Sequence, residues 1–176
     1  MTRYVSTRGE APALGFCDVM LAGLARDGGL YVPETWPQLS SATSAAFFGR
    51  PYWEVAVDVV RPFVGGEISD ADLGRMANEA YATFRHPAVV PLNQISPHQF
   101  VLELFHGPTL AFKDVAMQLI SRLMDHVLAK RGQRTTIVSQ RQATQAAPRS
   151  MRLRAWRMST SSCCFRTSAS PRCSSA

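Results

Sequence analysis

Apolar residues recur at helical spacing in four stretches of the chain, and this pattern predicts four amphipathic helices. The predicted helices span residues 15–26, 52–64, 69–84 and 114–130. Ser69 is expected to cap the third helix, because its hydroxyl can accept a hydrogen bond from a free backbone N–H of the first turn. The fourth helix carries the most regular apolar stripe, formed by Val115, Leu119, Ile120, Leu123 and Val127.

Short runs of β-branched, aromatic and aliphatic residues between the helices predict strands. These runs cover residues 4–7, 30–32, 89–92, 100–104 and 135–138. Gly28 or Gly29 should end the first helix, since glycine adopts a positive φ readily. Later in the chain the order is strand, loop, helix, strand, so we expect an α/β layered domain to begin there.

The composition changes abruptly after Val138. Residues 1–138 contain 12 Lys or Arg and all 13 Asp and Glu, whereas residues 139–176 contain seven Arg and no acid. The formal net charge of +6 therefore arises from the last 38 residues. Cys163 and Cys164 are adjacent there and no His lies near them, so no metal site is expected. Composition alone indicates a disordered basic tail.

Neither a membrane protein nor a specific nucleic-acid binder is expected from this composition. The chain has no run of 18 apolar residues and its first ten residues contain no apolar stretch typical of a signal peptide, so we expect a cytoplasmic protein. The arginines of residues 139–176 would bind phosphates weakly and in a salt-dependent way. Trp156 is the one good candidate in this segment for stacking on a nucleic-acid base.

One lysine stands in a distinctive context at residues 106–114, which read His-Gly-Pro-Thr-Leu-Ala-Phe-Lys-Asp. A lysine just before a helix is usually a solvated surface residue. These nine residues, however, resemble the lysine motif of the threonine synthase family. Residues 28–33, Gly-Gly-Leu-Tyr-Val-Pro, are similar to the N-terminal segment of the same family. The resemblance covers residues 1–138.

This resemblance implies the start of an enzyme of fold type II that depends on pyridoxal 5'-phosphate (PLP). Residues 1–88 would form the helical N-terminal domain, and residues 89–138 would begin the α/β catalytic domain. The family converts O-phospho-L-homoserine and water to L-threonine and phosphate. Lys113 would be the catalytic residue and would bind PLP as a Schiff base, while Phe112 and Asp114 beside it would complete the cofactor-binding loop and position it.

Schiff-base formation by a lysine is favoured where its amine is shielded from water. A lysine beside Phe112 is expected to be partly desolvated, which would favour the neutral amine that condenses with an aldehyde. Once displaced by substrate, that amine can carry protons between carbons. His106, by contrast, is expected to be a loop histidine that makes a hydrogen bond to the backbone.

The chain departs from the family directly after Val138. Threonine synthases continue with a loop of the type Gly-Ala-Thr-Ser-Gly-Asp-Thr-Gly-Gly-Ala, whose N–H and hydroxyl groups suit an anion. Residues 139–148 instead read Ser-Gln-Arg-Gln-Ala-Thr-Gln-Ala-Ala-Pro. Read from the third base of each codon, they permit Ala-Thr-Ser-Gly-Asp-Thr-Gly-Gly-Ala in order. Our hypothesis is that residues 139–176 result from a reading-frame shift near codon 139; a natural disordered tail is the alternative.

A frame shift at this point would leave Lys113 without its pocket and the central sheet with unpaired edges. We therefore expect the chain as written to fold poorly and to make no threonine. The competing interpretation is a non-catalytic fragment or binding module, which would bind a partner without PLP.

Overall fold

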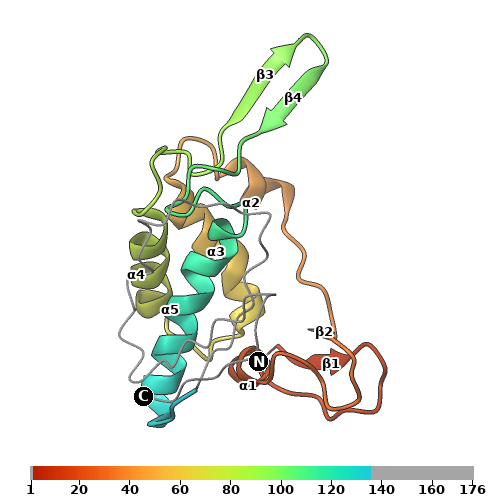
Figure 1. The fold of residues 1–176 in the computed structure, drawn as a ribbon. Helices are drawn as coiled ribbons and strands as arrows, with labels where there is room; N and C mark the ends of the chain where they lie inside the picture. Colours follow the sequence, from red (N-terminus) through yellow and green to blue (C-terminus); the bar gives the residue numbers. More distant parts are fainter. Residues whose placement is uncertain (1, 136–176) are drawn as a thin grey trace, which may run out of the picture. The chain divides into compact units, whose positions relative to one another are not determined.

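A computed structural model describes residues 2–135 of the chain (Figure 1). It divides into two compact units, residues 1–124 and residues 125–176. Almost all the described residues fall in the first unit. The strand predicted at residues 135–138 begins at the last described residue, and the tail predicted at residues 139–176 lies outside the described part.

The first unit opens with a small antiparallel pair of strands (Figure 1). β1 (Tyr4–Ser6) pairs with β2 (Tyr31–Pro33), with Val5 opposite Val32. Both strands were predicted, shifted by at most one residue. The helix between them, α1 (Phe16–Ala22), ends at Gly23 with φ +69°, earlier than the predicted residue 26.

Asp27 fixes the turn that leads into β2. Its carboxylate accepts a hydrogen bond from the Ser6 hydroxyl at 2.8 Å and from the Gly29 N–H at 2.9 Å, and it also accepts from the N–H groups of Glu10 and Ala11. The bond from Ser6 is the main reason that the pKa of Asp27 lies below its usual range. Gly28 has the predicted positive φ, +76°, but the prediction that this glycine pair ends the first helix is wrong, because α1 ends at Gly23.

Two antiparallel helices supply the core of the first unit. α3 (Tyr52–Val64) has the predicted bounds and contains Pro62, while α4 (Asp70–Tyr81) begins as predicted and ends three residues before Phe84. The residues most deeply buried along these helices are Val64, Leu73, Met76, Ala77 and Ala80. A short helix, α2 (Ser41–Ala45), was not predicted, because its serines, alanines and threonine carry no apolar periodicity.

The Ser69 cap at the start of α4 should contribute measurably to the free energy of unfolding. Its side chain accepts a hydrogen bond from the Asp72 N–H at 3.2 Å, as the sequence predicted. Ser69→Ala is expected to lower the free energy of unfolding by about 1 kcal/mol in a urea titration. Ser40→Ala, which removes the equivalent cap of the exposed five-residue helix α2, is the matched control and should cost less. Equal losses from both substitutions would contradict this.

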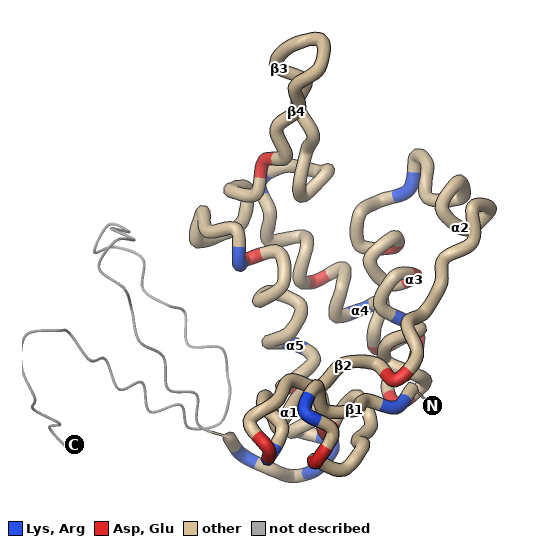
Figure 2. The backbone as a smooth tube through the Cα atoms, turned by 90° about the vertical axis from the view of Figure 1, so that its right-hand side faces the viewer, with Lys and Arg blue, Asp and Glu red and all other residues tan. Residues whose placement is uncertain are grey.

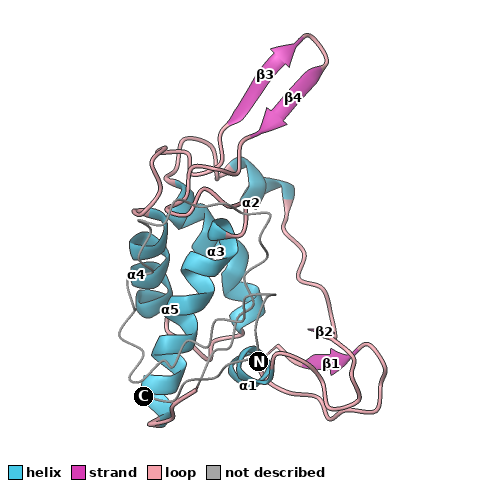
Figure 3. Cartoon of the chain, in the orientation of Figure 1, coloured by secondary structure: helices cyan, strands magenta, loops and turns pink. Residues whose placement is uncertain are grey.

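A β-hairpin and a long helix complete the described chain (Figure 3). β3 (Leu92–Ser96) pairs antiparallel with β4 (Gln99–Leu102). The strand predicted at residues 100–104 is therefore confirmed in its first part, but the one predicted at residues 89–92 is wrong. Pro87 and Pro91 flank a turn there, in which Val89 has φ +60°. Through residues 2–135 the strands occur only as these two antiparallel pairs.

α5 (Asp114–Arg131) confirms the fourth predicted helix, and Gly132 with φ +62° follows it. Of its predicted apolar stripe, Leu119, Leu123 and Val127 are buried, whereas Ile120 is 38% exposed. Among the described residues, no helix is both long enough and apolar enough to cross a membrane.

Candidate active site

The loop that carries Lys113 connects β4 to α5 within the first unit. It turns at Gly107, whose carbonyl accepts a hydrogen bond from the Leu110 N–H at 3.2 Å. Leu110 adopts φ +64°, a conformation that costs free energy for a residue with a side chain. The Lys113 carbonyl accepts from the N–H of Met117 at 2.9 Å, so the lysine is tied to the first turn of α5.

Asp114 holds this loop together from inside. Its side chain is only 4% exposed, and the carboxylate accepts from the Thr109 N–H at 2.8 Å. The Thr109 hydroxyl lies 2.8 Å from both carboxylate oxygens. Gly107 packs so closely on Asp114 that a Cβ at this position would overlap the Asp114 side chain. The loop conformation therefore depends on a buried carboxylate beside the lysine and on a glycine that leaves room for it.

The structure places Lys113 on the surface. Phe112, its neighbour, is 59% exposed, and Leu110 is 51% exposed. The expectation that Lys113 is partly desolvated is therefore wrong for the described residues, because sequence adjacency to an aromatic ring does not bring that ring over the amine. The amine is accessible, and any dry pocket around it needs walls from elsewhere.

His106 forms the other end of the loop and makes a different contact from the one expected. Its Nε2 lies 2.6 Å from a carboxylate oxygen of Glu103, whereas the sequence suggested a bond from its ring to the backbone. The second Glu103 oxygen accepts from the Asn93 amide at 2.6 Å, and the His106 carbonyl accepts from the Arg85 N–H at 2.9 Å. Glu103 thus links the base of the hairpin to the start of the lysine loop. This pair was missed because no pattern marks it in the sequence.

Acid should weaken this link. The hydrogen bond from His106, then that from Asn93, holds the pKa of Glu103 below its ordinary value of 4.5. A carboxylate with a lowered folded-state pKa stabilises the fold above about pH 4.5 and loses that contribution as the pH falls through the folded value. Glu103→Gln should therefore flatten the fall of melting temperature below about pH 4.5. Melting curves that remain parallel to those of the parent chain at every pH would contradict this.

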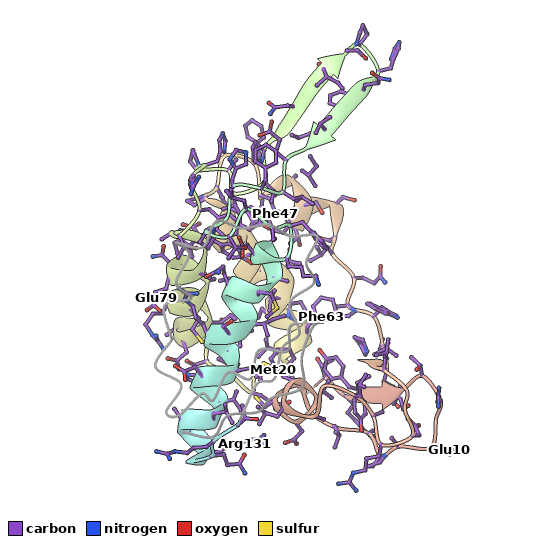
Figure 4. The ribbon with its side chains drawn as sticks, viewed as in Figure 1. Glu10, Met20, Phe47, Phe63, Glu79 and Arg131 are labelled. Atoms are coloured by element: carbon purple, nitrogen blue, oxygen red, sulfur yellow. The ribbon has the colours of Figure 1, made fainter. Side chains whose placement is uncertain are left out.

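Two contacts join the helix behind Lys113 to the helical core. The Tyr81 hydroxyl at the end of α4 donates to the Val115 carbonyl at 3.3 Å. Burial, with a smaller contribution from Tyr52, raises the pKa of Tyr81 to about 12, so this hydroxyl remains a donor even in mildly alkaline solution. Further along α5, Arg122 donates to the Gln118 carbonyl at 2.7 Å, and its Nε lies 3.9 Å from Glu79, which Figure 4 labels on α4.

The described part of the site can present an amine on a fixed loop, and it shows no metal-binding group: residues 2–135 contain no cluster of three His, Cys, Asp or Glu that could hold an ion. Phe112, Lys113 and Asp114 are consecutive in the chain and therefore share one loop. Phe112 and Lys113 lie at the surface, and Asp114 lies inside.

Known proteins match this chain over the same region. Residues 3–81 match the family model described as the threonine synthase N terminus. The chain is 60% identical over 136 residues to the threonine synthase of Pseudomonas aeruginosa, a match that covers 77% of this chain and 29% of that enzyme. It therefore spans less than a third of that relative's length.

Solved structures agree with the sequence match. The PLP-bound threonine synthase of Brucella melitensis superposes with a TM-score of 0.78 and 62% identity, covering 80% of this chain and 30% of that one. The yeast threonine synthase superposes with a TM-score of 0.72 and 35% identity, covering 78% and 30%. The long, partly irregular region from the first strand to the lysine loop therefore has the arrangement seen in these enzymes.

Proposed function

We propose that this chain, which is similar to the N-terminal part of threonine synthases, belongs to that family and supplies the lysine-bearing segment of a PLP-dependent enzyme. In this proposal Lys113 is the residue that binds PLP, and the complete enzyme converts O-phospho-L-homoserine and water to L-threonine and phosphate. The observation that carries it is the accessible amine of Lys113 on a loop held by Asp114, within a fold shared with a PLP-bound relative.

The described residues fit the lysine end of such a site. Lys113 is exposed, so nothing blocks condensation of its amine with an aldehyde, and the first turn of α5 fixes its backbone. PLP, when bound, supplies the electron sink for bond changes at the substrate carbons. Lys113 would then move protons at its amine, while Asp114 and Thr109 keep the loop in place. The exposed ring of Phe112 would help to exclude water once the pocket is closed.

The domain plan remains part of this proposal. Residues 1–88 would be the N-terminal domain and residues 89–138 the beginning of the catalytic domain. The carboxylate-binding loop and the loop that binds the cofactor phosphate would both lie beyond Val138. We propose a cytoplasmic enzyme of small-molecule metabolism with neither a membrane nor a nucleic acid as partner.

The reading-frame hypothesis makes a direct prediction about the nucleotide sequence. Sequencing of codons 135–180 should reveal a second open frame that encodes Ala-Thr-Ser-Gly-Asp-Thr-Gly-Gly-Ala of the family's loop, starting at the third base of about codon 139. An alternative frame closed by stop codons within this interval would instead support a natural tail.

The chain by itself should be inactive. The purified 176-residue protein, mixed with PLP and phosphohomoserine, is expected to release no phosphate above a blank, because the described residues leave Lys113 exposed to solvent. Steady phosphate release by this chain alone would overturn that expectation. The alternative, a non-catalytic binding module, would be favoured by a stable complex with a partner that forms in the absence of PLP.

A further inference from the structure

Two histidines from separate segments meet beside the lysine loop, and we call them the histidine pair. His86 lies in the connection between α4 and β3, outside the lysine motif, whereas His106 is the first residue of that motif. Their ring centroids are 5.2 Å apart, with an angle of 48° between the ring planes. The Arg85 N–H also donates to the His106 carbonyl at 2.9 Å, so rings and backbone together join the two segments.

The hydrogen bonds of each ring determine where its proton can lie. Nδ1 of His86 accepts from the Ala88 N–H at 3.1 Å, so this nitrogen carries no proton. Nε2 of His106 lies 2.6 Å from a Glu103 oxygen, and this carboxylate is ionised at neutral pH because its pKa is lowered, so Nε2 is the donor. The arrangement therefore allows a positive charge on His106 but not on His86.

Glu103 is the carboxylate that is hydrogen-bonded to the pair. It is the only charged residue between Arg85 and Lys113, and Figure 2 shows neither blue nor red along the two strands of the hairpin. Asp114, at the start of α5, is engaged by Thr109 inside the loop. Arg85 is itself a cation and adds to any positive charge on the pair.

The tyrosines beside His86 add no charge. Tyr52 on α3 and Tyr81 on α4 line the same hollow as His86. Burial raises the pKa of both tyrosines, so they stay neutral over the range in which histidines gain a proton, about pH 5–8. A proton added to Nδ1 of His86 would therefore remove its bond to Ala88 and place an uncompensated cation beside His106.

Each histidine also precedes a turn that contains a strained residue. The His86 carbonyl accepts from the Val89 N–H at 2.9 Å, and Val89 has φ +60°. In the turn after His106, Leu110 has φ +64°. Such conformations cost free energy and persist only where surrounding contacts hold them. Separation of the histidine pair would therefore let the turn that leads to Lys113 relax.

We propose that the histidine pair is a proton-sensitive clamp on the lysine loop: neutral His86 is a positioning residue for Lys113, and protonation of His86 releases the loop. The consequence for catalysis rests on the proposed function, whereas the clamp itself depends only on the described contacts. In the complete enzyme, turnover should fall with acid as His86 gains a proton, at a higher pH than the one at which Glu103 loses its charge.

The test replaces the ring of His86 by a group that keeps its hydrogen bond but cannot titrate. In a full-length hybrid, residues 3–135 of this chain replace the matching part of the Pseudomonas aeruginosa relative. An asparagine side chain readily accepts from the backbone N–H two residues ahead, as His86 does. His86→Asn should therefore move the acid limb of the kcat profile to lower pH by at least about 0.5 pH unit. His98→Asn, in the exposed turn of the hairpin, is the matched control and should leave the profile unchanged.

Hydrogen exchange in the same hybrid, corrected for the intrinsic effect of pH, tests the clamp without any chemistry. Peptides that cover residues 106–114 should lose protection between about pH 7.5 and pH 5.5 in the parent, but not in His86→Asn. If His86→Asn does not fold, His86→Ser serves instead, because a serine hydroxyl can accept the same bond.

The proposal would be overturned if His86→Asn lowered turnover by one factor at every pH, which is the effect of a purely structural residue. A shift of the same size from His98→Asn, or protection of residues 106–114 that does not change with pH in the parent, would also overturn it. A hybrid that exchanges as expected but never forms threonine would refute the proposed function and leave the clamp standing.

Discussion

Replacing Lys113 with alanine should abolish threonine formation by a full-length enzyme in which residues 3–135 of this chain replace the matching part of the Pseudomonas aeruginosa relative. The Lys113 amine would both bind the cofactor and transfer protons, so we expect the rate of threonine formation to fall by at least about 10³-fold. Phosphate release measures the loss. Borohydride reduction followed by mass spectrometry should place the cofactor on Lys113 in the parent and nowhere in the variant.

The specificity of that result rests on a second lysine. Lys130 lies exposed near the end of α5, so Lys130→Ala removes the same side-chain charge without touching the loop. It should keep near-parental activity. A Lys113→Ala enzyme that retained turnover, or a cofactor adduct found on a different lysine, would remove the basis of the functional assignment.

Gly107→Ala should damage the loop that presents Lys113. The added methyl group would overlap the buried Asp114 side chain, so either the glycine backbone or the carboxylate must move. Overpacking of this kind costs about 1–3 kcal/mol. In the hybrid enzyme we expect a lower melting temperature and a loss of turnover larger than the loss of stability explains, because the Thr109–Asp114 contact that fixes the lysine is disturbed.

Gly74→Ala is the matched control for this substitution. Gly74 lies within α4, and the nearest atom to a Cβ there is a ring carbon of Trp53 at 4.0 Å. Alanine at this helical position should raise stability by roughly 0.5–1 kcal/mol and leave turnover unchanged. If both glycine variants behaved alike, the close packing at Gly107 would have no functional meaning.

The helical part of the fold could be predicted from the sequence because its apolar periodicity is long and regular. α3, α4 and α5 begin where the pattern and the Ser69 cap indicated. Short elements were harder: α2 has no apolar face, and the pair Val89-Val90 resembles a strand but lies in a turn between two prolines. In both cases local sequence preference was weaker than the surrounding structure.

The site was predicted unevenly for a similar reason. A contiguous motif points to Lys113, Phe112 and Asp114, and it also contains Gly107 and Thr109, which hold the loop through Asp114. The contacts that join the loop and α5 to the rest of the unit involve residues outside the motif. Tyr81 reaches Val115 across 34 positions of the chain, and Glu103 meets His106 only because the loop bends. Exposure of Lys113 could not be predicted either, since solvent access depends on which other segments pack against the loop.

The hairpin of β3 and β4, whose strands contain no charged residue, has a consequence for the synthesis of such an enzyme. Ribosomes add roughly 5–20 residues per second, and domains at the N-terminus fold first. A relative of which these 136 residues are 29% therefore needs roughly twenty seconds to a minute more before its synthesis is complete. During that interval the nascent protein exposes two apolar strands to solvent. Chaperones that bind exposed apolar segments should therefore bind this hairpin. In a prematurely terminated product, these apolar strands would stay exposed permanently.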